Sequence, residues 1–131
     1  MKNKKIVWMG SLLGMLLLIM NACYYDEVIP VKQSVGDVGT IKFASDLIPI
    51  FNASCNVSGC HSAGGQKPNL TSTSAFTSLS TGGYIDKANP ENSLIYQRMK
   101  GNKGTPMPVS GSNATYNAKV LAWIKQGALN N

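Results

Sequence analysis

The sequence predicts an all-α domain of about four short helices joined by long loops. Apolar residues recur at helical spacing in several separate segments, and alternation with a period of two is not sustained over any useful length. The chain contains 13 glycines and many Ser, Thr and Asn residues, a composition typical of long loops. A length of 131 residues fits one small domain.

The first expected helix carries apolar residues at i, i+4, i+7 and i+8, from Phe43 to Phe51. We expect it to begin near Ser45 or Asp46, because either residue can cap a helix. Pro49 must then lie in the first turn, where its missing N–H costs little.

Three further helices are expected along the chain. A short one covers residues 72–79, and another begins after Pro90 and ends at Gly101. The last helix has Asn113 as its N-cap and Gly127 as its stop. All the regular secondary structure expected in the domain, residues 42–131, is therefore helical.

Residues 1–22 have the pattern of a secretory signal peptide, with a cationic start, an apolar middle and a small residue before the cleavage point. The apolar run from 6 to 20, as a helix, rises roughly 22 Å. This is shorter than the ~30 Å hydrocarbon core, so cleavage is favoured over a permanent span.

Cys23 directly follows Ala22, and this junction resembles the lipobox of bacterial lipoproteins. The resemblance implies that Cys23 is lipidated and becomes the first residue of the mature chain, which is then attached to a membrane. The alternative is ordinary cleavage that leaves Cys23 as a free thiol.

Residues 23–41 are expected to form a flexible linker, because they contain Pro30 and Gly36 and no sustained periodicity. The pair Asp26-Glu27 resembles an acidic export signal of some Bacteroidota lipoproteins; a solvated tether is the alternative. We expect an exported lipoprotein on the periplasmic side of a membrane, in the outer membrane or at the cell surface.

The net charge disfavours nucleic acid as a partner. The whole chain has 12 Lys and Arg against 6 Asp and Glu, a net charge of +6. Three of the lysines lie in residues 1–22, so the mature chain has 9 basic against 6 acidic residues, or +3. No block of basic residues of the kind that neutralises phosphates is present in the mature chain.

The candidate chemistry lies in the segment Cys55-Asn-Val-Ser-Gly-Cys60-His61. A structural disulfide between the two cysteines is the simplest interpretation, although it leaves His61 without a role. Zinc would need a fourth ligand, and a thiol–disulfide oxidoreductase would need a βαβ setting that the sequence lacks. The fourth interpretation is covalent haem, with both sulfurs joined to the porphyrin and His61 beneath the iron.

The segment resembles the haem motif of the c-type cytochromes in a variant with four residues between the cysteines. The resemblance implies one covalent haem c, attached through Cys55 and Cys60, with His61 as the proximal ligand. Gly59 would let the additional residues loop out, because glycine adopts backbone angles denied to other residues.

The segment Lys67-Pro68-Asn69-Leu70 resembles the Pro-Asn-Leu segment that follows the haem motif in many class I cytochromes c. The resemblance implies that the Pro68 carbonyl accepts the Nδ1–H of His61 and that Leu70 packs on the haem ring. Pro68 in a plain turn and Leu70 in the core are the alternatives.

Met107 is the expected distal ligand. It lies in an irregular segment between two prolines, which suits a thioether held against iron better than ordinary core packing. Met99, the rival in the mature chain, has the helical spacing of a core residue.

The resemblance covers residues 43–128 and includes the crossing of an early helix, bearing Phe51, with a final helix bearing Tyr116 and Trp123. The function expected is one-electron transfer between a protein donor and a protein acceptor, and not an enzyme activity. The alternative is a surface lipoprotein that acts as a binding module and has a disulfide in place of haem. A haem-bearing catalytic or gas-binding site is a third interpretation, which requires Met107 to be a labile ligand.

Overall fold

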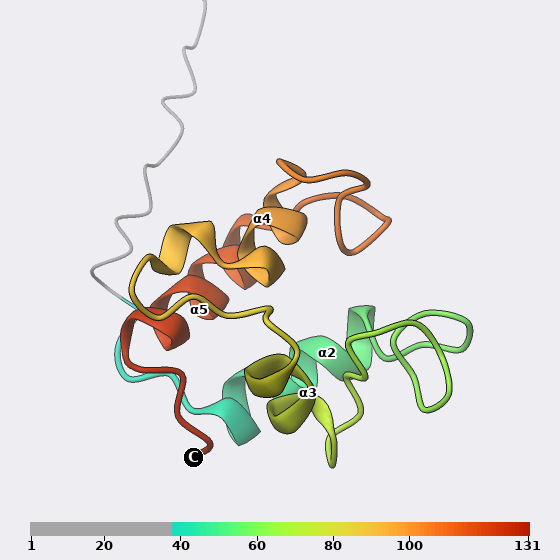
Figure 1. Ribbon diagram of the computed structural model, residues 1–131, viewed down its shortest axis with the longest axis horizontal. Coiled ribbons are helices and arrows are strands. Elements are labelled where there is room, and N and C mark those ends of the chain that lie inside the picture. Colours follow the sequence, from blue (N-terminus) through green and yellow to red (C-terminus); the bar gives the residue numbers. More distant parts are fainter. Residues whose placement is uncertain (1–37) are drawn as a thin grey trace, which may run out of the picture. The chain divides into compact units, whose positions relative to one another are not determined.

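The computed structural model describes residues 38–131, and the predictions for the signal peptide, for Cys23 and for most of the linker lie outside this range. The described residues form four α-helices, one π-helical turn and one 3₁₀ turn, with no β-strand (Figure 1). The predicted all-α class is confirmed. None of the helices in this range combines the length and the hydropathy needed to cross a bilayer.

The first helical segment consists of η3 (Phe43–Leu47) followed by α2 (Ile48–Ser54). It begins at Phe43, earlier than the predicted start at Ser45 or Asp46. The N–H of Ile48 donates to the carbonyl oxygen of Phe43, a π-type bond that widens the turn immediately before Pro49. Pro49 lies in the first turn of α2, as predicted. The π turn thus lets one continuous helical segment contain a proline.

The middle of the domain contains α3 (Ala75–Thr81), η4 (Pro90–Asn92) and α4 (Leu94–Lys100). The predicted start of α3 at residue 72 was three residues too early, because residues 71–74 form a separate turn. Between η4 and α4 the buried Ser93 has an extended backbone, and its hydroxyl accepts a hydrogen bond from the Asp86 N–H at 2.9 Å. Gly101 ends α4 in the left-handed conformation, as predicted.

The last helix, α5, covers Ala114–Lys125. The side chain of Asn113 accepts a hydrogen bond from the Tyr116 N–H at 3.0 Å, which confirms the predicted N-cap. Gly127 follows the helix with a φ of 98°, as a glycine stop requires.

The aromatic ring of Phe43 lies at the centre of the core. Its centroid is 5.1 Å from that of Trp123 on α5, 5.4 Å from that of Phe76 on α3 and 6.1 Å from that of Phe51 on α2. The expected contact between the first and last helical segments is therefore present, although Phe43 rather than Phe51 makes the ring contact with Trp123.

The C-terminal residue completes the start of the first helix. The Ala44 N–H donates to the backbone carbonyl oxygen of Asn131 at 2.9 Å, and the Phe43 N–H donates to its side-chain oxygen at 2.8 Å. These are two of the N–H groups that the first turn of a helix leaves without internal partners. The end of the chain thus stabilises the segment that leads to the cysteines.

Candidate functional site

The segment Cys55–His61 is closed into a loop by its own backbone. The N–H of Cys55 donates to the Phe51 carbonyl at 2.9 Å, and this bond continues α2 into the loop. The N–H of His61 then donates to the Cys55 carbonyl at 3.1 Å, so the two ends of the motif meet. Gly59 has a φ of 80°, the left-handed conformation expected of the residue that loops out.

Both cysteines in this loop are free thiols. Burial raises the pKa of the Cys55 thiol to about 11, and the nearby Cys60 contributes a smaller rise. The Cys55 thiol is consequently neutral near pH 7. Both thiols are half-buried on one closed loop, and no disulfide joins them in the structure.

The imidazole of His61 is oriented by backbone carbonyls. Its Nδ1 lies 2.9 Å from the carbonyl oxygen of Pro68 and 3.2 Å from that of Gln66. Since both partners are acceptors, Nδ1 must carry the proton. In the neutral ring the lone pair then lies on Nε2, for which residues 38–131 provide no hydrogen bond. This is the tautomer that an imidazole needs to ligate a metal through Nε2.

The segment that supplies the Pro68 carbonyl is itself fixed in place. The Leu70 N–H donates to the His61 carbonyl at 2.8 Å, and the Asn69 N–H donates to the hydroxyl of Ser78 on α3 at 2.9 Å. The Leu70 side chain is buried in the core. The segment that supplies the hydrogen-bond acceptor of His61 is therefore held in place by α3 and by the core.

A tight turn packs against the second cysteine. The Cys60 carbonyl accepts a hydrogen bond from the Gln66 N–H at 2.7 Å, and Gly65 lies directly against this carbonyl, with no room for a Cβ atom. The sequence analysis did not single out Gly65. No sequence pattern distinguishes Gly65 from the other loop glycines, because its close approach to the Cys60 carbonyl depends on how the backbone turns after His61.

Met107 lies in the second long loop, residues 101–113, and is half-buried. Its N–H donates to the carbonyl oxygen of Arg98 at 3.0 Å, which ties the loop to the last turn of α4. The ring of Pro106 lies against Gly101. Met107 is outside any helix, as predicted, whereas Met99 is buried in the core on α4 with 5% of its surface exposed.

Comparisons with protein-family models, with curated proteins and with solved structures find no match to this chain.

The structure brings Cys55, Cys60, His61, Pro68 and Leu70 together, and it places Met107 on a different loop. In Figure 1 the cysteine loop (residues 55–74, green) and the methionine loop (residues 101–113, orange) extend to the same side of the domain. No hydrogen bond between described residues joins the two loops. No group of three His, Cys, Asp or Glu side chains within residues 38–131 forms a conventional metal site.

Asn117 is a second residue that the sequence analysis missed. It is buried on α5, and its side-chain NH₂ donates to the hydroxyl of Ser112 at 2.8 Å, while its oxygen has no partner among the described residues. Its spacing from Leu121 and Ile124, i+4 and i+7, could have placed it on the buried face of the helix. The hydrogen bond fixes the end of the methionine loop to α5.

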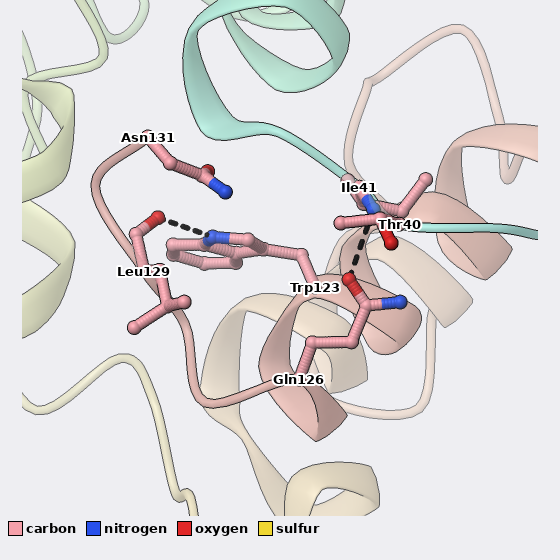
Figure 2. Close-up of a pocket in the computed structure, with 6 residues that line it drawn as sticks. All are labelled: Thr40, Ile41, Trp123, Gln126, Leu129 and Asn131. Carbon is pink, nitrogen blue, oxygen red and sulfur yellow. Dashed lines mark hydrogen bonds between the residues drawn. The ribbon is translucent and has the colours of Figure 1, made fainter.

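A pocket of about 210 Å³ lies elsewhere, where the start of the described chain meets its C-terminus (Figure 2). It is lined by Thr40, Ile41, Trp123, Gln126, Leu129 and Asn131. The Trp123 indole N–H donates to the Leu129 carbonyl at 2.8 Å, and the Gln126 side-chain oxygen accepts from the Ile41 N–H at 2.9 Å. The pocket contains none of the cysteine, histidine or methionine side chains of the candidate site.

Proposed function

We propose that the domain is a one-electron carrier, a monohaem c-type cytochrome tethered to a membrane through Cys23. Cys55 and Cys60 would hold the haem through two thioether bonds, His61 would be the proximal ligand and Met107 the distal ligand. The observation that carries the proposal is the 2.9 Å contact between the Nδ1 of His61 and the Pro68 carbonyl oxygen, which leaves Nε2 free to ligate.

The residues present fit this group in three respects. The two thiols are free and lie on a loop whose ends are joined by a hydrogen bond. The histidine next to the second cysteine has its tautomer fixed. The remaining donor is a neutral thioether on a separate loop that is tied to α4. Two thiols would form the covalent bonds of haem c to the porphyrin, and an imidazole with a thioether is the ligand pair of electron-carrying cytochromes c.

When bound, the haem supplies an iron that alternates between its ferrous and ferric states. The chain determines what that iron can do. If His61 and Met107 both held the iron, no position would be left for a substrate, and this would favour a carrier over an enzyme. The Pro68 carbonyl keeps the proton on Nδ1, and the core residues around Leu70 hold that carbonyl in place.

The covalent attachment also offsets a structural weakness of a small, loop-rich domain. A chain of this size has a core that contributes only a few kcal/mol of net stability, and its long loops add an entropic cost. Two thioether bonds and two iron bonds would tie both loops to one apolar disc. These bonds would hold the two loops in place relative to each other, which no hydrogen bond between described residues does.

The alternative is a binding module with a Cys55–Cys60 disulfide, which would leave the oriented imidazole of His61 without a role. The two functions are separated by a substitution in the loop. Cys60→Ser should leave at most one thioether, and we expect a poorly accumulating product with an altered haem spectrum. Ser58→Ala, a change in the same loop that removes no proposed haem bond, should accumulate and absorb like the wild type. A colourless, folded Cys60→Ser protein in wild-type yield would support the binding module.

A further inference from the structure

The chain enters the domain beside the end of α5, and one side chain holds it there. The side-chain oxygen of Gln126 accepts a hydrogen bond from the Ile41 N–H at 2.9 Å (Figure 2). The NH₂ group of the same side chain donates to the carbonyl oxygen of Gly39 at 2.8 Å. The last residues of the expected linker are therefore fixed to the domain.

The turn that follows is held by the last residue of the chain. The backbone carbonyl oxygen of Asn131 accepts from the Ala44 N–H at 2.9 Å, and its side-chain oxygen accepts from the Phe43 N–H at 2.8 Å. Four hydrogen bonds thus join residues 39–44 to residues 126–131. We call these two segments together the linker clasp.

The linker clasp lies at the opposite end of the domain from the cysteine and methionine loops. Helix α5 begins after Asn113, at the end of the methionine loop, and its 12 residues rise about 18 Å before Gln126. The helical segment from Phe43 to Ser54 likewise runs from the clasp to the cysteine loop. In Figure 1 the start of the coloured chain and its C-terminus lie on the left, whereas both loops extend to the right.

This geometry limits how a tethered domain can turn. As a random coil, residues 24–37 would span roughly 20 Å between Cys23 and the clasp. For either loop to reach the lipid surface, the domain would have to turn over, and the linker would have to extend along the length of α5 as well. Stretching a coil beyond its average length costs conformational entropy. The clasp raises this cost, because residues 39–44 cannot lengthen the linker.

We propose that the linker clasp turns one end of the domain toward the membrane and holds the cysteine and methionine loops on the side that faces the aqueous phase. The inference rests on one part of the proposed function, the lipid anchor at Cys23. It also identifies the kind of partner that can reach the two loops. That partner is a water-soluble protein or domain, and not a protein embedded in the bilayer that holds the anchor.

The orientation can be measured by NMR on the lipidated mature protein, purified from membranes and reduced. The protein is placed in bicelles with and without a gadolinium-chelating lipid, which broadens the signals of amides near the lipid surface. We expect the broadening in residues 38–44 and 126–131 to be at least threefold larger than in residues 55–67 and 101–112. Because each signal is compared with and without gadolinium, the measurement does not depend on haem.

Two variants test the clasp and the length of the linker. Gln126→Ala removes two of the four hydrogen bonds and should lower the ratio of broadening between the two ends at least 1.5-fold. Its matched control is Gln97→Ala, since the Gln97 side chain also donates to a backbone carbonyl, that of Glu91, but lies outside the clasp. The control should keep the wild-type ratio. A Gly/Ser insertion of about twenty residues between Lys32 and Gln33 should bring the ratio close to one.

Equal broadening at the two ends of the wild-type domain, or stronger broadening in the loops, would overturn the orientation. A wild-type ratio in Gln126→Ala would overturn the role of the clasp. A mature protein that carries no lipid and stays apart from the bicelles would overturn the inference together with the lipid anchor. The haem content of the same sample tests the electron carrier separately, and a protein without haem that shows the expected ratio would support the orientation and overturn the carrier.

Discussion

Replacing Gly65 with alanine tests whether the turn beside the second cysteine supports the histidine. Gly65 has no left-handed φ, so an alanine is compatible with its backbone conformation. The new Cβ would nevertheless overlap the Cys60 carbonyl oxygen and would lie 3.2 Å from the carbonyl oxygen of Ser62. Both obstacles are backbone atoms, which cannot be relieved by rotating a side chain.

The loss of stability in Gly65→Ala follows from the backbone atoms that must move. Shifting the Cys60 carbonyl weakens its 2.7 Å hydrogen bond from the Gln66 N–H, and the loss of one such hydrogen bond costs about 0.5–1.5 kcal/mol. Overpacking adds a cost of similar size, so we expect a loss of about 2–3 kcal/mol. For a domain of this size, such a loss lowers the melting temperature by roughly 10–20 °C. Because His61 directly follows Cys60, the imidazole must also be displaced.

Two measurements on the purified protein check this prediction, namely thermal unfolding and the visible absorption spectrum. The matched control is Gly83→Ala, since Gly83 has a φ of 73° and its added Cβ would meet no atom within 4 Å. That variant should lose only about 1 kcal/mol, from the left-handed backbone, and should keep the wild-type spectrum. If Gly65→Ala melts and absorbs like Gly83→Ala, the turn does not support the histidine.

Three further predictions follow from the site and the fold. Met107→Ala should abolish the weak sulfur-to-iron band of the oxidised spectrum and lower the midpoint potential. Met99→Leu should do neither, because Met99 is a core residue. The reverse result would make Met99 the ligand. Cys23→Ser should release the protein from the membrane fraction or stall its processing, and a mature variant that still sediments with membranes would contradict the lipid anchor. Asn113→Ala should lower the free energy of unfolding by about 1 kcal/mol through loss of the α5 N-cap without changing the spectrum, and denaturant titration that shows no loss would contradict this role of the side chain.

The sequence predicted those parts of the fold that depend on local chemistry. Asn113 caps α5, and Gly101 and Gly127 end their helices, because capping and left-handed glycines are determined by a few neighbouring residues. The start of the first helix was wrong, since the π turn before Pro49 forms only in the context of the whole segment.

The resemblance implied that the first and last helical segments meet, but the individual long-range contacts were beyond the sequence analysis. The hydrogen bonds from Phe43 and Ala44 to Asn131 join residues almost ninety positions apart, and no local pattern marks their partners. Helical spacing placed Phe51 on the core face, yet only the packed structure shows that Phe43 is the residue in ring contact with Trp123.

One contact of the candidate site was expected from the sequence and is present in the structure. The resemblance to class I cytochromes c implied the hydrogen bond between His61 and Pro68, and the structure contains it at 2.9 Å. The close approach of Gly65 to Cys60 could not be predicted, because it depends on how the turn after His61 folds back. The ligand role of Met107 stays a prediction, since the chain's own hydrogen bonds tie its loop to α4 and not to the cysteine loop.

The most direct test of the proposed function is a pyridine haemochrome spectrum of the protein purified from membranes, combined with its intact mass. We predict one haem per chain, an absorption maximum of the type given by two thioether bonds, and a mass increase of one haem that survives denaturation. A colourless protein whose mass contains no haem, with Cys55 and Cys60 joined as a disulfide, would contradict the account.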